Sequence, residues 1–141
     1  MKALIVDDDP DVVNFLTQVA AAFGDVEVES ANSAEEALTM VIRSNYDLIT
    51  LDIVMPGASG LEILSMVRDL CPHAVVAIVS AHVPEEISDE LAGCADVILT
   101  KPVPLETIHR VLAGAARVSE AVQDIRILGD LPTSVRMGVE G

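Results

Sequence analysis

Short apolar runs alternate along this chain with longer stretches in which apolar residues recur every three or four positions. The short runs have the length and composition of β-strands, whereas the longer stretches have the period of amphipathic helices. The pattern predicts five strands, near residues 2–7, 26–30, 47–52, 74–80 and 95–100. Strands that alternate with helices in this way belong to a parallel sheet, because each helix returns the chain to the starting edge of the sheet.

Local signals mark where four of the five expected helices begin. Proline is tolerated at the first position of a helix, and a serine followed three residues later by glutamate forms a capping box. The acidic residue before the first helix, Asp9, is interpreted as its N-cap. The predicted starts are Pro10, Ser33 with Glu36, Ser59 with Gly60, and the segment Pro84, Glu85, Glu86.

Two of the predicted strands, at residues 74–79 and 97–99, are apolar throughout. A strand without alternation is covered on both faces of its sheet, so helices should lie on both sides. We therefore expect an α/β three-layer sandwich with five helices, which occupies about residues 1–118. Residues 119–141 are expected to form a C-terminal helix extension and a tail, too short for an effector domain.

Length and composition narrow the class of protein. A chain of 141 residues, 51% of them apolar, suits one compact domain. The two cysteines, Cys71 and Cys94, lack the spacing of a zinc site and are interpreted as small apolar residues. No charged leader precedes a long apolar segment, which predicts a cytoplasmic protein outside the membrane. The net charge of -15 disfavours direct binding to nucleic acid.

Polar residues follow or end four of the predicted strands: Asp7 and Asp8, then Asp52, Ser80 and Lys101. Because the carboxyl ends of parallel strands share one edge, where α/β proteins bind ligands, we expect these side chains to converge. Two carboxylates about 4 Å apart repel by roughly 4 kcal/mol at a surface dielectric, so the cluster needs a cation. Mg²⁺ takes one or two carboxylates together with waters and phosphate oxygens, which Asp8 and Asp52 suit.

Phosphoryl transfer is the chemistry that this cluster favours. A phosphoryl group moving to or from Asp52 spreads charge over three oxygens, so catalysis consists mainly of positioning and charge neutralisation. The Lys101 ammonium can pair with a phosphoryl oxygen or with Asp52, while the Ser80 hydroxyl hydrogen-bonds another oxygen. Lys101 precedes Pro102, and the sequence leaves the isomer of that peptide bond open.

Four short motifs occur at these strand ends: IVDDDP from Ile5, LDIVMP from Leu51 with Gly60, IVSA from Ile78, and LTKP from Leu99. On these motifs, in this order and at these intervals, the chain resembles the receiver domain of response regulators in two-component signalling. The resemblance covers about residues 1–118.

This resemblance implies a flavodoxin-like fold with strand order 2-1-3-4-5. It implies that Asp52 accepts a phosphoryl group from the phosphohistidine of a sensor histidine kinase or phosphotransfer protein, with Lys101 and Ser80 beside it. Mg²⁺ would be held by Asp8, Asp52 and the backbone carbonyl of Val54, with Asp7 acting through water. Such a domain is a phosphoacceptor with self-phosphorylation and autodephosphorylation chemistry rather than an enzyme, and it switches the binding of an unidentified protein partner.

Three positions bear on output and on the lifetime of the phosphoryl group. Where the family commonly has a switch Tyr or Phe, three residues before Lys101, this chain has Ile98. Ile98 is either a core residue, the interpretation that we favour, or an aliphatic version of the switch coupled to Ser80. At the variable positions flanking the pocket, we hypothesise that apolar Val54 slows hydrolysis and that His82 is an exposed spectator.

Other functional classes remain open at this point. The chain is either a complete regulator or the receiver fragment of a longer effector protein. A Mg²⁺-dependent phosphatase with Asp52 as nucleophile would have a second acid at position 54, where Val54 stands. A receiver-like interaction module that is not phosphorylated would be expected to lack Asp8, Asp52 or Lys101, and all three are present.

Overall fold

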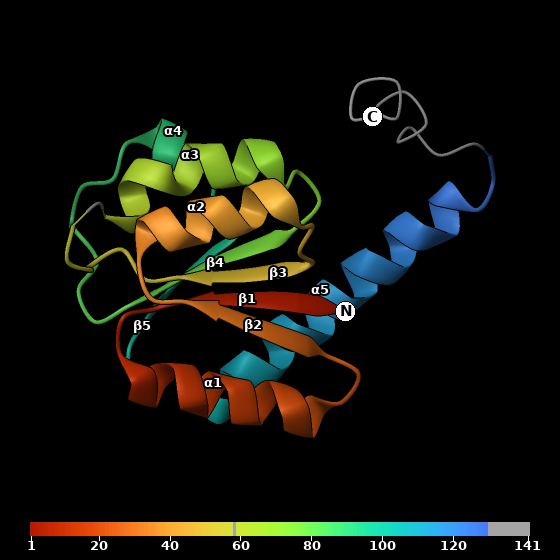
Figure 1. Ribbon diagram of the computed structural model, residues 1–141, viewed down its shortest axis with the longest axis horizontal. Helices are drawn as coiled ribbons and strands as arrows, with labels where there is room; N and C mark the ends of the chain where they lie inside the picture. Colours follow the sequence, from red (N-terminus) through yellow and green to blue (C-terminus); the bar gives the residue numbers. More distant parts are fainter. Residues whose placement is uncertain (58, 130–141) are drawn as a thin grey trace.

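Five parallel strands form one sheet in the computed structural model, which describes residues 1–57 and 59–129 (Figure 1). The strands lie in the order β2-β1-β3-β4-β5. Every predicted strand is confirmed, with ends that shift by one or two residues. The bounds are Lys2–Val6 for β1, Glu27–Ala31 for β2, Leu48–Leu51 for β3, Val75–Ser80 for β4 and Val97–Thr100 for β5.

Helices cover both faces of this sheet, as Figure 1 shows. α2, α3 and α4 lie on one face, while α1 and α5 lie on the other. The three-layer, flavodoxin-like prediction is therefore confirmed. The bounds are Pro10–Phe23 for α1, Ala34–Arg43 for α2, Gly60–Leu70 for α3, Asp89–Ala92 for α4 and Leu105–Arg126 for α5.

The helix starts at α1, α2 and α3 agree with the sequence signals. Asp9 caps α1, because its carboxylate accepts a hydrogen bond from the Asp11 amide at 2.9 Å. The Ser33 hydroxyl oxygen accepts from the Glu36 amide at 3.1 Å, while the Glu36 carboxylate accepts from the Asn32 amide at 2.7 Å. The capping box is thus present, but the Glu36 carboxylate accepts from the amide of Asn32 rather than from that of the N-cap residue Ser33.

The predicted start of the fourth helix at Pro84 is wrong. α4 begins only at Asp89, and its N-cap is Ser88, whose hydroxyl oxygen accepts from the Leu91 amide at 3.2 Å. The two glutamates that suggested a first helical turn, Glu85 and Glu86, are exposed. A helix as short as this one is unstable in water unless tertiary packing supports it.

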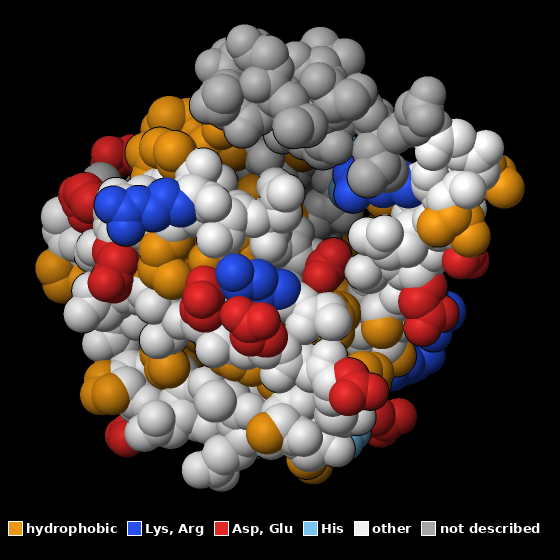
Figure 2. Space-filling view, turned by 45° about the vertical axis from the view of Figure 1, so that its right-hand side comes forward, with side chains coloured by type: hydrophobic (Ala, Val, Ile, Leu, Met, Phe, Trp, Pro, Cys, Tyr) orange, Lys and Arg blue, Asp and Glu red, His pale blue; other side chains and the backbone are white. Residues whose placement is uncertain are grey.

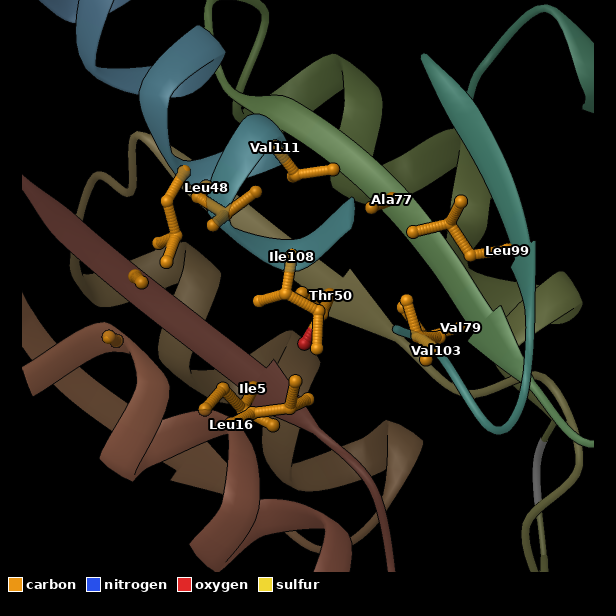
Figure 3. A pocket seen from close by; sticks show the side chains of 13 residues that line it. Ile5, Leu16, Leu48, Thr50, Ala77, Val79, Leu99, Val103, Ile108 and Val111 are labelled. Carbon is orange, nitrogen blue, oxygen red and sulfur yellow. The ribbon is translucent and has the colours of Figure 1, made fainter. Parts of the chain in front are cut away.

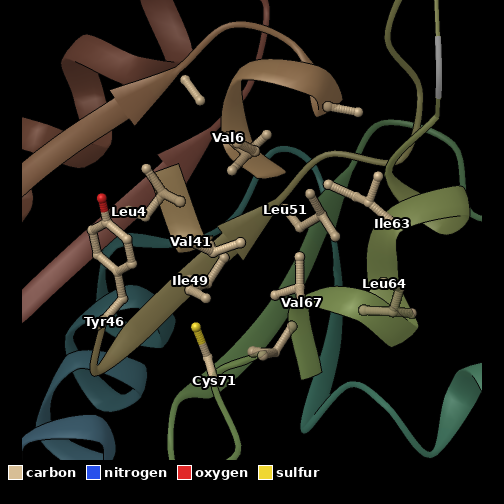
Figure 4. Packing of buried hydrophobic residues seen from close by; sticks show 14 of the residues in the cluster. Leu4, Val6, Val41, Tyr46, Ile49, Leu51, Ile63, Leu64, Val67 and Cys71 are labelled. Carbon is tan, nitrogen blue, oxygen red and sulfur yellow. The ribbon is translucent and has the colours of Figure 1, made fainter. Parts of the chain in front are cut away.

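Alternation along each strand divides the core in two. Leu4 of β1 lies with Ile49 and Leu64 in the core between the sheet and the helices α2 and α3 (Figure 4). Ile5 lies in the other core, between the sheet and the helices α1 and α5 (Figure 3). Successive side chains of a strand point to opposite faces, so each strand supplies both cores. Of the two free cysteines, Cys71 is buried in the first core and Cys94 is half-buried at its margin.

The edge strand β5 departs from the sequence-based expectation. β4 is buried along nearly its whole length, as predicted, but β5 pairs only with β4 and is half-exposed. Its Ile98 is 37% exposed, so the interpretation of Ile98 as a core residue is wrong. An apolar run cannot distinguish a central strand from an edge strand, because the difference depends on which neighbours cover it.

α5 continues past residue 118, where the sequence predicts a C-terminal helix extension. It runs without a break to Arg126, and its C-terminal part projects beyond the sheet (Figure 1). Residues 130–141 of the predicted tail lie outside the described residues. No helix in the described part of the chain is long and apolar enough to cross a bilayer. Acidic side chains are spread over the face in Figure 2 rather than collected in one patch.

A small cavity lies between the sheet and the helices α1 and α5 (Figure 3). Its volume is about 30 Å³, and apolar side chains such as Leu16, Val79 and Ile108 line it. The Thr50 hydroxyl is buried there without a hydrogen-bond partner. A water needs two or more polar partners, so a cavity with this lining stays dry and the hydroxyl is left unsatisfied.

Replacing Thr50 with valine should therefore stabilise the fold. Thr50→Val exchanges an unpaired buried hydroxyl for a methyl group, and we expect the free energy of unfolding to rise by about 1 kcal/mol. Urea denaturation measures this change. The matched control is Thr39→Val, whose hydroxyl already donates to the Glu35 carbonyl at 3.1 Å on an exposed face. Equal effects of the two substitutions would contradict the explanation.

Candidate functional site

The carboxyl ends of four strands bring together the five residues singled out in the sequence. Asp7 and Asp8 follow β1, Asp52 follows β3, Ser80 ends β4 and Lys101 follows β5. Backbone hydrogen bonds continue the sheet to these positions, from the Asp52 amide to the Val6 carbonyl at 2.9 Å and from the Lys101 amide to the Ser80 carbonyl at 2.8 Å. The sheet itself therefore holds the backbone of the site in place.

The Lys101 ammonium group joins two of the carboxylates. Its Nζ donates to Asp7 Oδ2 at 2.7 Å and to Asp52 Oδ2 at 3.1 Å. Both carboxylates are buried, and the lysine side chain is largely covered. The peptide bond between Lys101 and Pro102, which the sequence left open, is cis.

The other oxygen of Asp52 is also held. Its Oδ1 accepts from the Ser80 hydroxyl at 3.0 Å and from the Val54 amide at 2.9 Å. Ser80 is fully buried, and its hydroxyl also lies 3.3 Å from the His82 carbonyl. With both oxygens engaged, the Asp52 carboxylate has a fixed orientation at the edge of the sheet.

Three carboxylates in this cluster lie close enough to share a cation. Asp7, Asp8 and Asp52 each present an oxygen, and these oxygens lie within 4.8 Å of one another. Asp8 is exposed, whereas the other two are buried, so an ion can reach the cluster from solvent on the Asp8 side. An all-oxygen, acidic donor set fits a hard divalent cation such as Mg²⁺.

The protonation equilibria reflect this crowding. Burial raises the pKa of Asp7 above its usual value, and the hydrogen bond from Lys101 offsets only part of that rise. Burial acts to lower the pKa of Lys101, but the hydrogen bonds with Asp7 and Asp52 outweigh it, and the pKa of Lys101 lies above its usual range. Lys101 is therefore a fixed positive charge at neutral pH.

Gly60 has a role that the sequence interpretation missed. A side chain at Gly60 would collide with the carbonyl oxygen of Asp52. Only glycine lets the N-terminus of α3 approach the strand end this closely. Gly60 stands close to the Asp52 motif in the sequence, but the sequence alone indicates it only as part of a helix start.

The remaining candidates lie at the rim of the cluster or outside it. His82 is exposed, and it contributes its backbone carbonyl rather than its ring. The Val54 side chain is 56% exposed, although its amide contacts Asp52. Ile98 pairs with Ile78 in the sheet, two residues from the strand ends that form the site.

Comparison with known proteins identifies the class. The sequence profile of the response regulator receiver domain matches residues 3–113, and the chain belongs to this family. It is therefore a receiver domain of the kind found in response regulators of two-component systems, in which phosphorylation of an aspartate is typical; such domains are not enzymes in the ordinary sense.

Curated relatives agree with this assignment. The chain is 33% identical over 138 residues to the response regulator protein PilR of Pseudomonas aeruginosa, covering 93% of this chain and 31% of PilR. It is 34% identical over 117 residues to the regulatory protein VanR of Enterococcus faecium, covering 82% of this chain and 50% of VanR. The chain thus spans half or less of the length of these relatives.

Solved structures show the same fold. The response regulator TrrA of Thermotoga maritima, solved in complex with Mg²⁺-BeF, has a TM-score of 0.71 and 31% identity, covering 81% of this chain and 97% of that one. A receiver domain protein of Methanospirillum hungatei has a TM-score of 0.72 and 25% identity, covering 85% of this chain and 97% of that one.

Removing the ammonium group of Lys101 should strongly destabilise the fold. Lys101→Met leaves the carboxylates of Asp7 and Asp52 facing each other, and we expect a loss of about 2–3 kcal/mol in the free energy of unfolding in EDTA. The double variant with Asp52→Asn should recover part of that loss, because it removes one of the two charges.

The matched control for this prediction is Lys2→Met. Lys2 lies 3.7–3.8 Å from two glutamates at the surface, an ion pair that is expected to contribute less than about 1 kcal/mol. Urea unfolding curves of the variants measure all three changes. If Lys101→Met proved no less stable than Lys2→Met, the proposed role of Lys101 in joining the Asp7 and Asp52 carboxylates would be contradicted.

Proposed function

We propose that Asp52 is the phosphoacceptor of this receiver domain. The observation that supports it is the fixed Asp52 carboxylate, held between the Lys101 ammonium and the Ser80 hydroxyl beside two further carboxylates. An Asp52 oxygen attacks phosphorus, and the bond from phosphorus to the donor's histidine nitrogen breaks. The electron pair of that bond stays on the nitrogen, and an acyl phosphate forms on Asp52.

The side chains around Asp52 have distinct tasks in this step. Lys101 is already charged and close to Asp52 Oδ2, so it neutralises negative charge on a phosphoryl oxygen. The Ser80 hydroxyl now donates to Asp52 Oδ1 and would donate to a second phosphoryl oxygen after transfer. Such preorganised donors lower the barrier because they need little rearrangement as charge develops.

A divalent cation completes the proposed site. Asp8 and Asp52 would hold Mg²⁺ together with the backbone carbonyl of Val54, and Asp7 would act through water. When bound, Mg²⁺ supplies positive charge that offsets the repulsion between the carboxylates and the incoming phosphoryl group. The acidic, all-oxygen cluster supports this assignment.

The proposed donor is the phosphohistidine of a sensor histidine kinase or phosphotransfer protein. Asp52 would also take a phosphoryl group from a small phosphodonor, and the acyl phosphate would hydrolyse without a separate phosphatase. The output is proposed to be a change in binding to a protein partner, with no direct contact to nucleic acid, in line with the net charge of -15.

The proposed domain division assigns about residues 1–118 to the receiver and 119–141 to a helix extension and tail. Because the chain spans half or less of the length of its curated relatives, the activity of a longer effector protein is a second possibility. The third candidate, a phosphatase with Asp52 as nucleophile, is disfavoured because the exposed Val54 side chain cannot act as its acid.

Incubation with a small phosphodonor and Mg²⁺ tests the site. The wild type should gain one phosphoryl group by intact mass measurement, whereas Asp52→Asn should gain none. Asp8→Asn should react at least about tenfold more slowly because it loses a metal ligand. The control is Asp89→Asn, in the exposed first turn of α4, which should react like the wild type. Equal uptake by Asp52→Asn would overturn the assignment.

Val54 should control the lifetime of the acyl phosphate. Its side chain is exposed at the rim, two residues after Asp52, and cannot orient an attacking water. We expect Val54→Asn to speed dephosphorylation by about tenfold, since an amide can hydrogen-bond that water. Val54→Leu is the matched apolar control and should leave the rate nearly unchanged. Decay of the phosphorylated mass after removal of the donor measures both, and an unchanged rate in Val54→Asn would disprove the idea.

A further inference from the structure

The loop between β3 and α3 carries part of the proposed metal site on its backbone. Val54, the proposed source of a carbonyl ligand, donates its amide to Asp52 Oδ1 at 2.9 Å. The side chains of Ile53 and Met55 anchor this first part of the loop, because both are buried in the core that α2 and α3 share with the sheet. Further along, the loop is exposed at Gly57. Core packing therefore fixes the loop before Gly57 but not at it.

The side chain of Glu35, in the first turn of α2, reaches this exposed part of the loop. Gly57 has a φ of 82°, in the left-handed region that glycine adopts without a steric penalty. A β-carbon at Gly57 would lie 3.6 Å from Glu35 Oε2 and 3.9 Å from Glu35 Oε1. Among the described residues not adjacent in the chain, no other atom lies within 4 Å of that point. The Glu35 carboxylate thus covers the Gly57 backbone on this side.

The start of α2 is itself held to the strand that leads to Asp7. The Asp7 amide donates to the Ala31 carbonyl at 3.0 Å, two residues before the N-cap Ser33. Figure 1 shows that the start of α2 and the loop after β3 lie at the same end of the sheet. Glu35 therefore connects a helix start fixed beside Asp7 with the loop that follows Asp52.

We propose that Glu35 is a positioning residue of the metal site, whose carboxylate holds the loop at Gly57 and thereby keeps the Val54 carbonyl in place for Mg²⁺. A backbone ligand binds more tightly when its loop is already ordered, because ordering the loop on binding costs conformational entropy. Groups that orient a ligand without touching the metal influence metal affinity in this way. The inference rests on the metal site proposed above.

Glu35 acts through the loop rather than as a ligand or as a remote charge. The carboxylates whose oxygens lie within 4.8 Å of one another belong to Asp7, Asp8 and Asp52, and Glu35 is not among them. Attraction between a remote carboxylate and Mg²⁺ depends on charge and changes little with side-chain length. Contact with Gly57 depends on length instead. Glu35→Asp keeps the charge and Glu35→Gln keeps the length, so the two variants distinguish these explanations.

Calorimetric titration of the whole protein with MgCl₂ tests the proposal. Glu35→Ala and Glu35→Asp should raise the dissociation constant of Mg²⁺ about tenfold, because neither side chain reaches the loop. Glu35→Gln should stay within about twofold of the wild type, since it keeps the length and an oxygen that accepts hydrogen bonds. The matched control is Glu106→Ala, which removes an exposed acidic side chain from the first turn of α5 and should bind Mg²⁺ like the wild type. Weakened binding in Glu35→Gln, or wild-type binding in Glu35→Asp, would overturn the proposal.

Amide hydrogen exchange in EDTA is a second measurement, and it needs no metal. The Val54 amide should exchange faster in Glu35→Ala and Glu35→Asp than in the wild type, because a loosened loop exposes it more often. The Lys2 amide is the internal control. It also donates to a carboxylate, Asp47 Oδ2 at 2.8 Å, and its exchange should be the same in every variant. Equal exchange of the Val54 amide in the wild type and Glu35→Ala would disprove the role of Glu35.

Asp8→Asn separates a failure of this inference from a failure of the metal site. If the wild type bound no Mg²⁺, or if Asp8→Asn bound it as tightly as the wild type, the proposed metal site would be wrong and the inference with it. If the wild type bound Mg²⁺ through Asp8 but Glu35→Ala matched Glu106→Ala, only the role of Glu35 would be refuted.

Discussion

The ammonium group of Lys101 lies 2.7 Å from Asp7 and 3.1 Å from Asp52, although the three residues come from distant parts of the chain. Without a cation at this place, the edge of the sheet would hold buried carboxylates of like charge. Strand order is what makes the contact possible, because β1, β3, β4 and β5 end side by side. The fold and the site thus depend on the same arrangement of strand ends.

The same arrangement of strand ends keeps the site apart from the exposed edge of the sheet. Asp52 and Ser80 are buried and held by hydrogen bonds, whereas Ile98 lies two residues before the end of a half-exposed edge strand. β5 runs from the site to the exposed edge of the sheet. The residue that it exposes there, Ile98, is aliphatic rather than aromatic. The C-terminal part of α5 is a second exposed surface, and it projects beyond the sheet.

Much of the fold could be predicted because its signals are local. Apolar runs located all five strands, and Asp9 and Ser33 capped the helices that their sequence positions suggested. The predicted start of α4 at Pro84 is wrong because the exposed Glu85 and Glu86 resemble a first helical turn, whereas the helix begins only at Asp89. Local preference decides such short segments only when tertiary packing supports it.

The sequence by itself determined which chemical groups stand at the strand ends, since Asp7, Asp52 and Lys101 could be assigned from the apolar runs before them. Only the tertiary structure decided which groups touch. It showed that Gly60 makes room beside the Asp52 carbonyl and that Ile98 is exposed. Burial and contact depend on residues that are distant in the chain, whereas strand and helix signals depend on neighbours. The sequence therefore predicted the members of the site, and packing determined their geometry.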